Sequence, residues 1–379
     1  MRLLSLLGIA LTLVVTAAPH AQAAPLAGHD FITEARELLV LGACADGPPP
    51  AVKPAVHAAH CKAMRAAQDA YKQSWLGAAR TFFAAHVPAG IPKTVVYPFA
   101  GGDLSTALAV FPDADEITTL SLEPAGDPRA HTRLTAGQTK AALATVQAEL
   151  SSLYRANFSV TMNMITAMRG GKLPTQLIFG LSALWIHGYE PVSLRYFDVG
   201  DDGALRYLTA EDVAAAEVLR DAGKRNRVFA NIELRFKKPG GREQIYRHIM
   251  ANLDDAHLAK APGPLKYLES KGTVAAMTKA ASYLLSFGEF ATMRTFVIDH
   301  VAWMVSDSTG LPPAVGTAAG FEYETHGTFE TSNMKAGGAV APAWKAMFAA
   351  QPRRALPFRF GYPDGKFRGH LIVMRKPAR

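Results

Sequence analysis

The stretch TVVYPFAGGDLSTALAVFPDADEITTLSLE, residues 94–123, predicts how the chain folds. Thr94 to Tyr97 and Ile117 to Leu122 are short runs rich in β-branched residues, which is typical of strands. Leu104 to Val110 between them has the composition of a helix, and Asp103 suits its N-cap. The order strand, helix, strand within about 30 residues is a βαβ unit, so we expect an α/β protein.

A glycine turn joins the first of these strands to the helix. Gly101 and Gly102 allow backbone N–H groups at the helix N-terminus to approach a ligand closely. Glu123 ends the second strand, near the spacing of about 20 residues at which an acidic side chain binds ribose hydroxyls in such units. Gly101, Gly102, Asp103 and Glu123 are therefore the candidate ligand-binding residues. The simpler alternative is that the two glycines only allow a tight turn.

This stretch resembles the first segment of class I S-adenosylmethionine-dependent methyltransferases. The resemblance implies a Rossmann-type fold in which Gly101 and Gly102 line the cofactor and Glu123 holds its ribose. The chain departs from those enzymes, because it carries Tyr97-Pro98-Phe99 and two adjacent glycines where they have an acidic residue and three spaced glycines. We therefore expect a methyltransferase-like scaffold without methyl transfer, and we predict no cofactor.

A second resemblance covers more of the chain. Three segments are similar to a family of exported bacterial proteins of unknown function: VVYPFAGGD (95–103) followed by FPDADEITTLSLEPAG (111–126), TKAASYLLSFGEFATMRTFVIDH (278–300) and VSDSTGLPP (305–313). That resemblance implies a shared fold from about residue 30 to residue 375. It implies no mechanism.

Residues 1–23, MRLLSLLGIALTLVVTAAPHAQA, have the pattern of a secretory signal peptide. Arg2 precedes an apolar run from Leu3 to Val15, and Ala21-Gln22-Ala23 offers small residues to a signal peptidase. We expect cleavage near Ala23 and a bacterial protein that is periplasmic or secreted. An uncleaved N-terminal anchor is the alternative. No later stretch of the sequence is long and apolar enough to predict a membrane span.

The chain has two cysteines, Cys44 and Cys61. In an oxidising compartment such a pair predicts a disulfide. Gly47 to Pro50 must interrupt the chain between two helical stretches, so the bridge would hold two helices as a hairpin. His57 and His60 next to Cys61 are an alternative set of metal ligands. Because a paired cysteine does not bind metal, we predict no metal site.

The hydrophobic pattern divides the chain into four regions: a signal peptide (1–23), a helical N-terminal region (24–90), an α/β core (91–220) and an α+β C-terminal region packed on that core (221–379). Val228 to Lys238 alternates apolar and polar residues, as a half-buried antiparallel strand does. Pro357 to Tyr362 and Phe367 to Met374, on either side of a turn at Pro363-Asp364-Gly365, predict an antiparallel hairpin.

Composition limits the classes of partner. The 379 residues include 40 basic and 32 acidic side chains, a net charge of +8, with 49% hydrophobic and 19% charged residues. These values exclude a disordered chain, and no nucleic-acid-binding motif accompanies the mild positive charge. The most basic stretch consists of Lys224-Arg225-Asn226-Arg227 with Arg235, Lys237, Lys238 and Arg242, and we interpret it as the solvated face of an antiparallel hairpin. Contact with anionic lipid is the alternative.

Two further sets of side chains have the residue types of hydrolases. Lys279 and Ser282 lie three positions apart, which would suit a Ser–Lys pair on a helix, although a core segment leading into a helix is the simpler interpretation. The second set has the residue types of a catalytic triad: Asp307, Ser308 and either His300 or His326. No Gly-x-Ser-x-Gly turn accompanies it.

Together these patterns predict an exported protein that binds an unknown small molecule or an envelope component, without nucleic acid as a partner. A secreted hydrolase and an active S-adenosylmethionine-dependent methyltransferase are the enzymatic alternatives. Export disfavours the methyltransferase, because the methyl donor is a cytoplasmic metabolite. A purely structural envelope protein is a third alternative, and it predicts Tyr97 and Phe99 packed into the core.

Overall fold

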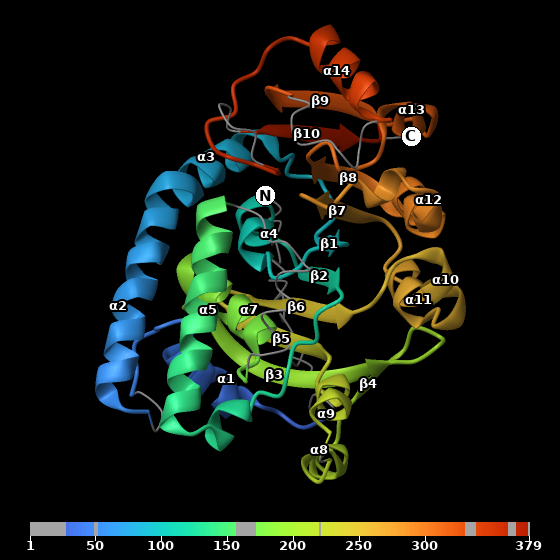
Figure 1. The fold of residues 1–379 in the computed structure, drawn as a ribbon. Coiled ribbons are helices and arrows are strands. Elements are labelled where there is room, and N and C mark those ends of the chain that lie inside the picture. Colours follow the sequence, from blue (N-terminus) through green and yellow to red (C-terminus); the bar gives the residue numbers. More distant parts are fainter. Residues whose placement is uncertain are drawn as a thin grey trace, which may run out of the picture.

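The structure is a computed structural model that describes residues 28–48, 52–156, 172–219, 221–329, 339–362 and 369–377. The predicted signal peptide (1–23), with its cleavage site near Ala23, lies outside the described residues, and so does the predicted turn at 363–365. Within the described residues the chain is a mixed α/β protein, with helices on both faces of one large sheet (Figure 1).

The sheet has ten strands among the described residues, in the order β4-β3-β5-β6-β2-β1-β7-β8-β10-β9. The central strands β6, β2, β1, β7 and β8 run parallel, and antiparallel pairs extend the sheet at both edges. Their bounds are β1 (Thr94–Tyr97), β2 (Glu116–Ser121), β3 (Glu190–Val199), β4 (Leu205–Tyr207), β5 (Asn231–Lys237), β6 (Glu243–Met250), β7 (Val274–Thr278), β8 (Val301–Ser306), β9 (Glu322–Gly327) and β10 (His370–Arg375).

The predicted βαβ unit is present. Strand β1 and helix α4 (Leu104–Val110) have the predicted bounds, and β2 begins one residue earlier than expected. The Asp103 side chain caps α4 by accepting a hydrogen bond from the Thr106 backbone N–H. Strands β1 and β2 pair in parallel, with Val95 opposite Ile117. The central region of the sheet is thus built on the stretch that the sequence analysis singled out.

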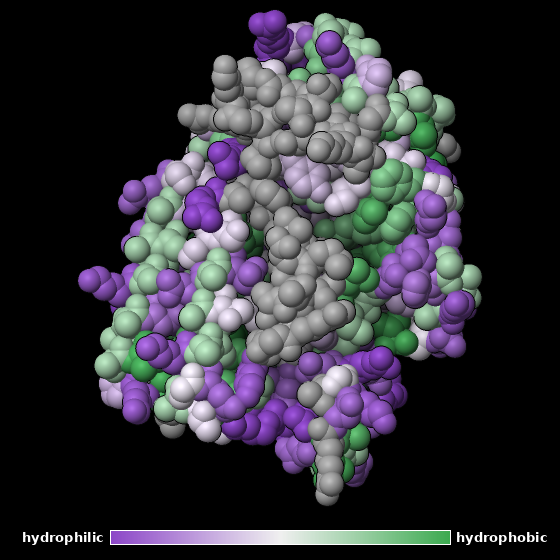
Figure 2. Space-filling model, in the orientation of Figure 1, coloured by the Kyte–Doolittle hydropathy of each residue, from purple (hydrophilic) through white to green (hydrophobic). Residues whose placement is uncertain are grey.

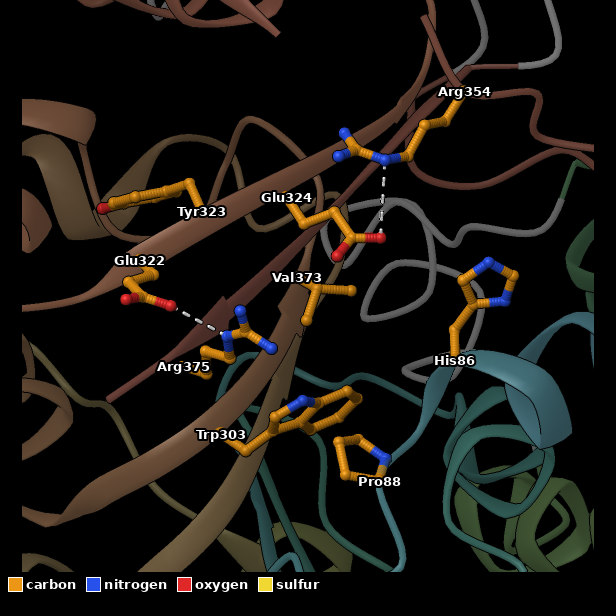
Figure 3. A pocket seen from close by; sticks show the side chains of 9 residues that line it. All are labelled: His86, Pro88, Trp303, Glu322, Tyr323, Glu324, Arg354, Val373 and Arg375. Carbon is orange, nitrogen blue, oxygen red and sulfur yellow. Dashed lines mark hydrogen bonds and ion pairs between the residues drawn. The ribbon is translucent and has the colours of Figure 1, made fainter. Parts of the chain in front are cut away.

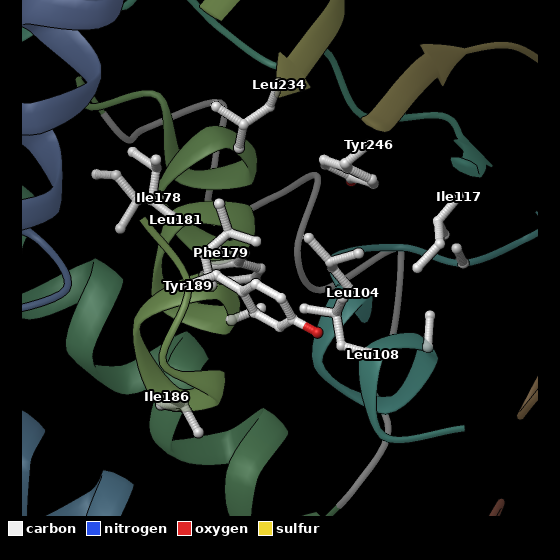
Figure 4. Close-up of a cluster of buried hydrophobic side chains, with 14 of the residues drawn as sticks. Leu104, Leu108, Ile117, Ile178, Phe179, Leu181, Ile186, Tyr189, Leu234 and Tyr246 are labelled. Carbon is white, nitrogen blue, oxygen red and sulfur yellow. The ribbon is translucent and has the colours of Figure 1, made fainter. Parts of the chain in front are cut away.

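One face of the sheet is covered by helices from the first half of the chain. They are α1 (Ile32–Leu41), α2 (Pro54–Tyr71), a π-helical turn (Lys72–Leu76), α3 (Gly77–His86), α4, α5 (Ala136–Ala156) and α7 (Thr175–His187). Figure 4 shows Leu104 and Leu108 of α4 opposite Phe179 of α7, in the larger of the two hydrophobic cores. Val95 faces this core, whereas Val96 faces the opposite core, as the alternation of a strand requires.

The other face is covered by helices from the second half of the chain. They are α10 (Asp255–Lys260), α11 (Gly263–Glu269), α12 (Ala291–His300), α13 (Pro313–Ala318) and α14 (Ala341–Ala350), while α8 (Ala210–Glu217) and α9 (Ala222–Val228) lie below the β3/β4 end in Figure 1. Strands on both sides of residue 220 belong to the one sheet. The predicted region boundaries at 90 and 220 stay a prediction.

The helical hairpin at the N-terminus and its disulfide are confirmed. Cys44 and Cys61 are bonded to each other, and no other cysteine is present. The bridge joins the segment after α1 to the middle of α2. None of the described helices combines the length and the apolar character that a bilayer span requires.

One sequence expectation for the C-terminal region is wrong, and another is confirmed only in part. Residues 357–362 do not pair with β10 as a hairpin strand; β10 pairs instead with β8 and β9, and Phe360 forms only an isolated bridge to Gly369. The basic stretch is divided, because Lys224 to Arg227 belong to helix α9, which is capped by Asp221. Its other members lie on the antiparallel pair of β5 and β6 or in the turn between them: Arg235, Lys237, Lys238 and Arg242.

Strand β5 pairs antiparallel with β3 and β6 and is half-buried, as predicted, with one exception on its polar side. The polar side of β5 carries Glu233, which is 1% exposed and accepts hydrogen bonds from Arg235, Arg247 and Tyr207. This network satisfies the buried carboxylate of Glu233, whereas Asn231 and Arg235 on the same side are partly exposed and Lys237 is exposed.

Candidate functional site at the carboxyl edge of the sheet

Three charged side chains follow the carboxyl ends of three neighbouring parallel strands. Asp103 follows β1, Lys279 follows β7 directly, and Asp307 follows β8 directly. Because the carboxyl ends of parallel strands meet at one edge of a sheet, the topology brings together residues that lie far apart in the sequence, from Asp103 to Asp307. We call Asp103, Lys279 and Asp307 the charged cluster.

Lys279 and Asp103 form a buried ion pair. The Lys279 Nζ atom lies 2.5 Å from Asp103 Oδ2, and the two side chains are 1% and 5% exposed. Lys279 also donates to Thr106 Oγ1 at 2.8 Å. Thr106 and Tyr97 in turn donate their hydroxyls to the Asp103 carboxylate, at 2.8 and 3.1 Å. Removing two charges from water is costly, so a pair this deep needs such supporting hydrogen bonds.

Asp307 fastens the segment after β7 to the segment after β8. Its Oδ2 atom accepts from the Ala280 backbone N–H at 2.9 Å, and its Oδ1 atom accepts from the Thr309 backbone N–H at 2.9 Å. The Thr309 hydroxyl then accepts from the Ala281 backbone N–H at 2.8 Å. Gly361 (φ +73°) closes over this carboxylate, because a Cβ there would lie 2.3 Å from Asp307 Oδ2.

The backbone of these segments is strained. Phe99, Ala280, Ser282 and Tyr283 have φ between 51° and 61°, and only one other described non-glycine residue, Cys44, has a positive φ. Each such residue costs about 1–3 kcal/mol and persists only where the surroundings hold it in place. The described left-handed non-glycine residues therefore concentrate after β1 and β7, beside the charged cluster.

Burial also changes the acid–base chemistry of the cluster. It lowers the pKa of the Lys279 amine, and the Asp103 carboxylate opposes that change. Burial and the same carboxylate raise the pKa of the Tyr97 hydroxyl well above its usual value. Burial thus makes the Lys279 amine easier to deprotonate and the Tyr97 hydroxyl harder to deprotonate than the free groups are.

The glycine turn that the sequence analysis proposed is packed against helix α7. A Cβ at Gly102 would lie 2.1 Å from Cδ2 of Phe179. Gly101 has φ +54°, and its carbonyl accepts a hydrogen bond from the Gln176 side chain at 2.8 Å. Both glycines are buried and are required here by backbone conformation and close packing.

Glu123 is fully buried behind the end of β2. Its backbone carbonyl accepts a hydrogen bond from His248 Nε2 at 2.7 Å, and burial lowers the pKa of His248 to about 4. Of the four predicted ligand-binding residues, only Asp103 belongs to the charged cluster. It stays a prediction that Gly101, Gly102, Asp103 and Glu123 line one ligand crevice.

The residues considered for a hydrolase do not form the Ser–Lys pair or the triad of that alternative. Ser282 bonds to the Tyr362 hydroxyl, and the described contacts contain no bond between Ser282 and Lys279. The Ser308 hydroxyl bonds to Tyr283 at 3.0 Å, while its backbone N–H donates to His370 Nε2 at 2.9 Å.

The histidines named for that triad lie elsewhere. His300 precedes β8 and bonds to the Gly272 carbonyl, so the whole length of the strand separates it from Ser308. His326 bonds to Glu324 and packs against Phe82. His370 is the histidine beside Ser308, and no local sequence pattern pointed to it.

One of the grooves lined by described residues lies near the ends of the parallel strands. This groove of about 610 Å³ opens at the carboxyl edge, after β6, and Figure 2 shows apolar side chains around a hollow beside α10, α11 and α12. The groove adjoins strained Phe99, whose ring packs edge-on against Phe290 at 5.6 Å. Its lining residues are Asp254, Asp255, Ala256, His257, Phe287, Glu289 and Phe290.

A cavity of about 300 Å³ lies on the other face, towards the amino end of β8. Figure 3 shows Trp303 and Pro88 on one side and two ion pairs, Glu322–Arg375 and Glu324–Arg354, on the other. These charges are already paired within the protein, so the cavity offers a ligand little unpaired charge.

Lys279 and Asp307 are the cluster residues whose role sequence reasoning missed. Each directly follows a strand, β7 or β8, that the sequence analysis did not predict. A signal was present in each case, because VAAMT and VAWMVS are short apolar runs that end at a polar residue. Comparison of the chain with models of protein families, with curated proteins and with solved structures finds no match.

Proposed function

We propose that this protein binds a small ligand at the carboxyl edge of its sheet, in the bacterial cell envelope, and transfers no methyl group. The observation that carries the proposal is that the charged cluster lies beside four non-glycine residues with strained backbone conformations. Strain of this kind concentrates at binding and catalytic sites, because elsewhere it only costs stability.

The topology supports this location. Numbered in chain order, the five parallel strands β1, β2, β6, β7 and β8 have the spatial order 3-2-1-4-5, as in Rossmann-type sheets. The strand order reverses between β1 and β7, and ligands of such sheets bind outside the carboxyl ends of the strands at that point. The methyltransferase-like resemblance of residues 94–123 agrees with this order.

The packing of the glycine turn argues against methyl transfer. The resemblance requires the methyl donor to lie against Gly101 and Gly102, but Phe179 and Gln176 of α7 already occupy the space beside these residues. Lys279 holds the carboxylate of Asp103 that follows them. We infer that the ligand enters instead through the groove lined by Phe287 and Phe290.

Export supports the same proposal. The predicted signal peptide would carry the protein away from the cytoplasmic methyl donor, and the disulfide between Cys44 and Cys61 suits an oxidising compartment. The ligand would then be a molecule of the envelope or of the medium.

The test is a thermal-shift screen of the purified protein against nucleosides, sugars, single-chain lipids and S-adenosylmethionine. A compound that binds the native state raises Tm by mass action. We expect a compound other than S-adenosylmethionine to raise Tm, and we expect Asp103→Asn combined with Lys279→Met to abolish the shift. Lys140→Met, at an exposed position of α5, is the matched control and should retain it.

Two outcomes would count against the proposal. A shift by S-adenosylmethionine that needs Glu123 would favour the methyltransferase alternative. A shift that survives in the double variant would place the ligand away from the charged cluster.

A further inference from the structure

The segment around the disulfide holds a second set of chemically active side chains. Cys44 Sγ, Cys61 Sγ and a ring nitrogen of His60 lie within 4.8 Å of one another, and all three residues are buried. His57 adds a fourth donor, because its Nε2 atom lies 3.3 Å from Cys61 Sγ. His57, His60 and Cys61 lie on one turn of α2, whereas Cys44 follows α1.

The ring of His60 is already oriented as metal-binding histidines are. Its Nε2 atom bonds to the Gly42 carbonyl at 3.0 Å, which places the proton on Nε2. Its Nδ1 atom is buried and has no hydrogen-bond partner among the described residues, and the side chain is 5% exposed. A ligating histidine typically donates its other N–H to a backbone carbonyl in this way, which fixes the ring and the tautomer.

The Nδ1 atom is the atom of His60 that a metal ion would use, because Nε2 is already bonded to the Gly42 carbonyl. An unpartnered buried nitrogen is costly in a folded protein, and a metal ion would satisfy it.

We propose that reduction of the Cys44–Cys61 disulfide creates a zinc site formed by Cys44, Cys61 and His60, with His57 as the fourth ligand. Two thiolates and two imidazoles are a preferred tetrahedral donor set for Zn²⁺. His57 would exchange its present bond to the Val40 carbonyl, at 3.0 Å, for the metal.

The electron and proton balance of the step is simple. A dithiol reductant supplies two electrons, the S–S bond breaks, and the reductant is oxidised to its own disulfide. Each cysteine sulfur receives one proton. Binding of Zn²⁺ then releases these two protons, since only the thiolates coordinate, and the oxidation state of zinc does not change.

The consequence is a cross-link that exists in both redox states. The disulfide holds the α1 segment to α2 when the protein is oxidised, and zinc holds the same two segments when it is reduced. This inference does not depend on the proposed ligand site, because the charged cluster shares no residue with it.

The experiment is a titration with Co²⁺ and Zn²⁺ of the purified full-length chain, either oxidised or reduced anaerobically with a phosphine. We expect the reduced protein to bind Co²⁺ with the visible absorption and thiolate charge-transfer bands of a tetrahedral sulfur-ligated ion, and Zn²⁺ to displace it. The oxidised protein should give neither band. Cys44→Ser combined with Cys61→Ser should remove the bands.

Substitution of His60 tests whether this residue binds the metal. His60→Gln should lower the Zn²⁺ affinity of the reduced protein by more than the roughly 10–100-fold typical of residues that only support a ligand. His300→Gln, the same change far from the disulfide, should have no effect. Unchanged affinity in His60→Gln would overturn the proposal.

Thermal unfolding of the reduced protein tests the proposal even if reduction of the disulfide destabilises the fold. Zn²⁺ should raise the Tm of the reduced wild type and leave that of the double serine variant unchanged. A reduced wild type that shows no tetrahedral cobalt spectrum, or whose Tm does not respond to Zn²⁺, overturns the proposal.

Discussion

Lys279 is the residue on which the charged cluster depends. Its amine is the only cation among the three residues of the cluster, and it neutralises Asp103 at a depth where water does not reach either group. A buried pair of this kind contributes little net stability, but loss of one partner leaves the other charge buried without compensation. The pair is therefore sensitive to loss of either partner although it adds little net stability.

We predict that Lys279→Met lowers the free energy of unfolding by about 3–5 kcal/mol, because Asp103 stays buried without its partner. Asp103→Asn combined with Lys279→Met should recover much of that loss, since both charges are then absent. Urea unfolding of the two variants measures the difference. A double variant as unstable as the single one would show that the ion pair is not the source of the effect.

The glycine turn gives a second prediction at the scale of a residue. Gly102→Ala places a Cβ 2.1 Å from Cδ2 of Phe179, so it should destabilise the protein by about 1–3 kcal/mol through overpacking. Gly90→Ala is the matched control, because nothing lies within 4 Å of a Cβ there. Equal unfolding midpoints for the two variants would contradict the packing described for Gly102.

Buried neutral histidines predict how stability depends on pH. Burial lowers the pKa of His187 to about 3 and that of His248 to about 4, against an ordinary value of 6.5. Below pH 6.5 the unfolded chain binds protons at these rings that the folded chain does not bind. The stability they contribute is thus complete above pH 6.5 and falls as the pH falls towards these lower values.

Each such histidine changes the free energy of unfolding by at most about 1.4 kcal/mol per pH unit. Urea unfolding between pH 7 and pH 5 isolates the effect of the histidines from that of Glu116. Arg247 and Lys271 lower the pKa of Glu116 to about 2, although burial opposes them. Glu116 therefore adds to the loss of stability only below its ordinary pKa of 4.5. His187→Gln should reduce the slope in that window. If the stability of His187→Gln depended on pH as steeply as that of the wild type, His187 would not be neutral and buried in the folded protein.

Among the elements, the α1–α2 hairpin is the one held by a covalent bond. Cys44 and Cys61 are 17 positions apart, and closing a loop of this size stabilises a protein by about 3 kcal/mol in the chain-entropy model. The hairpin also packs into the larger core through Phe31 and Met64, so we expect it to remain folded at lower stability without the bridge.

We predict that Cys44→Ser combined with Cys61→Ser lowers the free energy of unfolding by about 3 kcal/mol at 25 °C. Reduction of the wild type in the presence of a chelator should give the same loss. A double variant as stable as the oxidised wild type would show that the bridge does not constrain the unfolded chain.

The elements differ in how well the sequence predicts them. The strand–helix–strand unit at 94–123 is predicted almost to the residue, because a glycine turn and an N-cap mark its helix. Strands β7 and β8 were missed, since a strand covered on both faces has no alternation and a short apolar run does not distinguish it from a helix.

At the scale of the whole molecule, topology produces the site. Asp103, Lys279 and Asp307 come from three separate segments, and only the parallel order of β1, β7 and β8 brings them together. Asp103 is predicted from its local turn, but the only partners that the sequence offers for Lys279 and Asp307 are their neighbours Ser282 and Ser308. Partners at such separations cannot be found from one sequence without the strand order.

The same topology separates two chemical regions. The charged cluster and the groove beside Phe290 lie at the carboxyl edge of the parallel strands, whereas the disulfide lies in the helical layer that covers one face of the sheet. The proposed ligand binding at the edge and the proposed redox chemistry in the helical layer should therefore respond to separate mutations.

Hydrogen–deuterium exchange tests the central claim most directly. The exchange of the protein is measured with and without the nucleoside, sugar or lipid that raises its Tm in the thermal-shift screen. We predict slower exchange in residues 99–104 and 279–283, the segments that carry the strained backbone and the charged cluster. Protection confined to other segments, with these two unchanged, would contradict a ligand site at the carboxyl edge of the sheet.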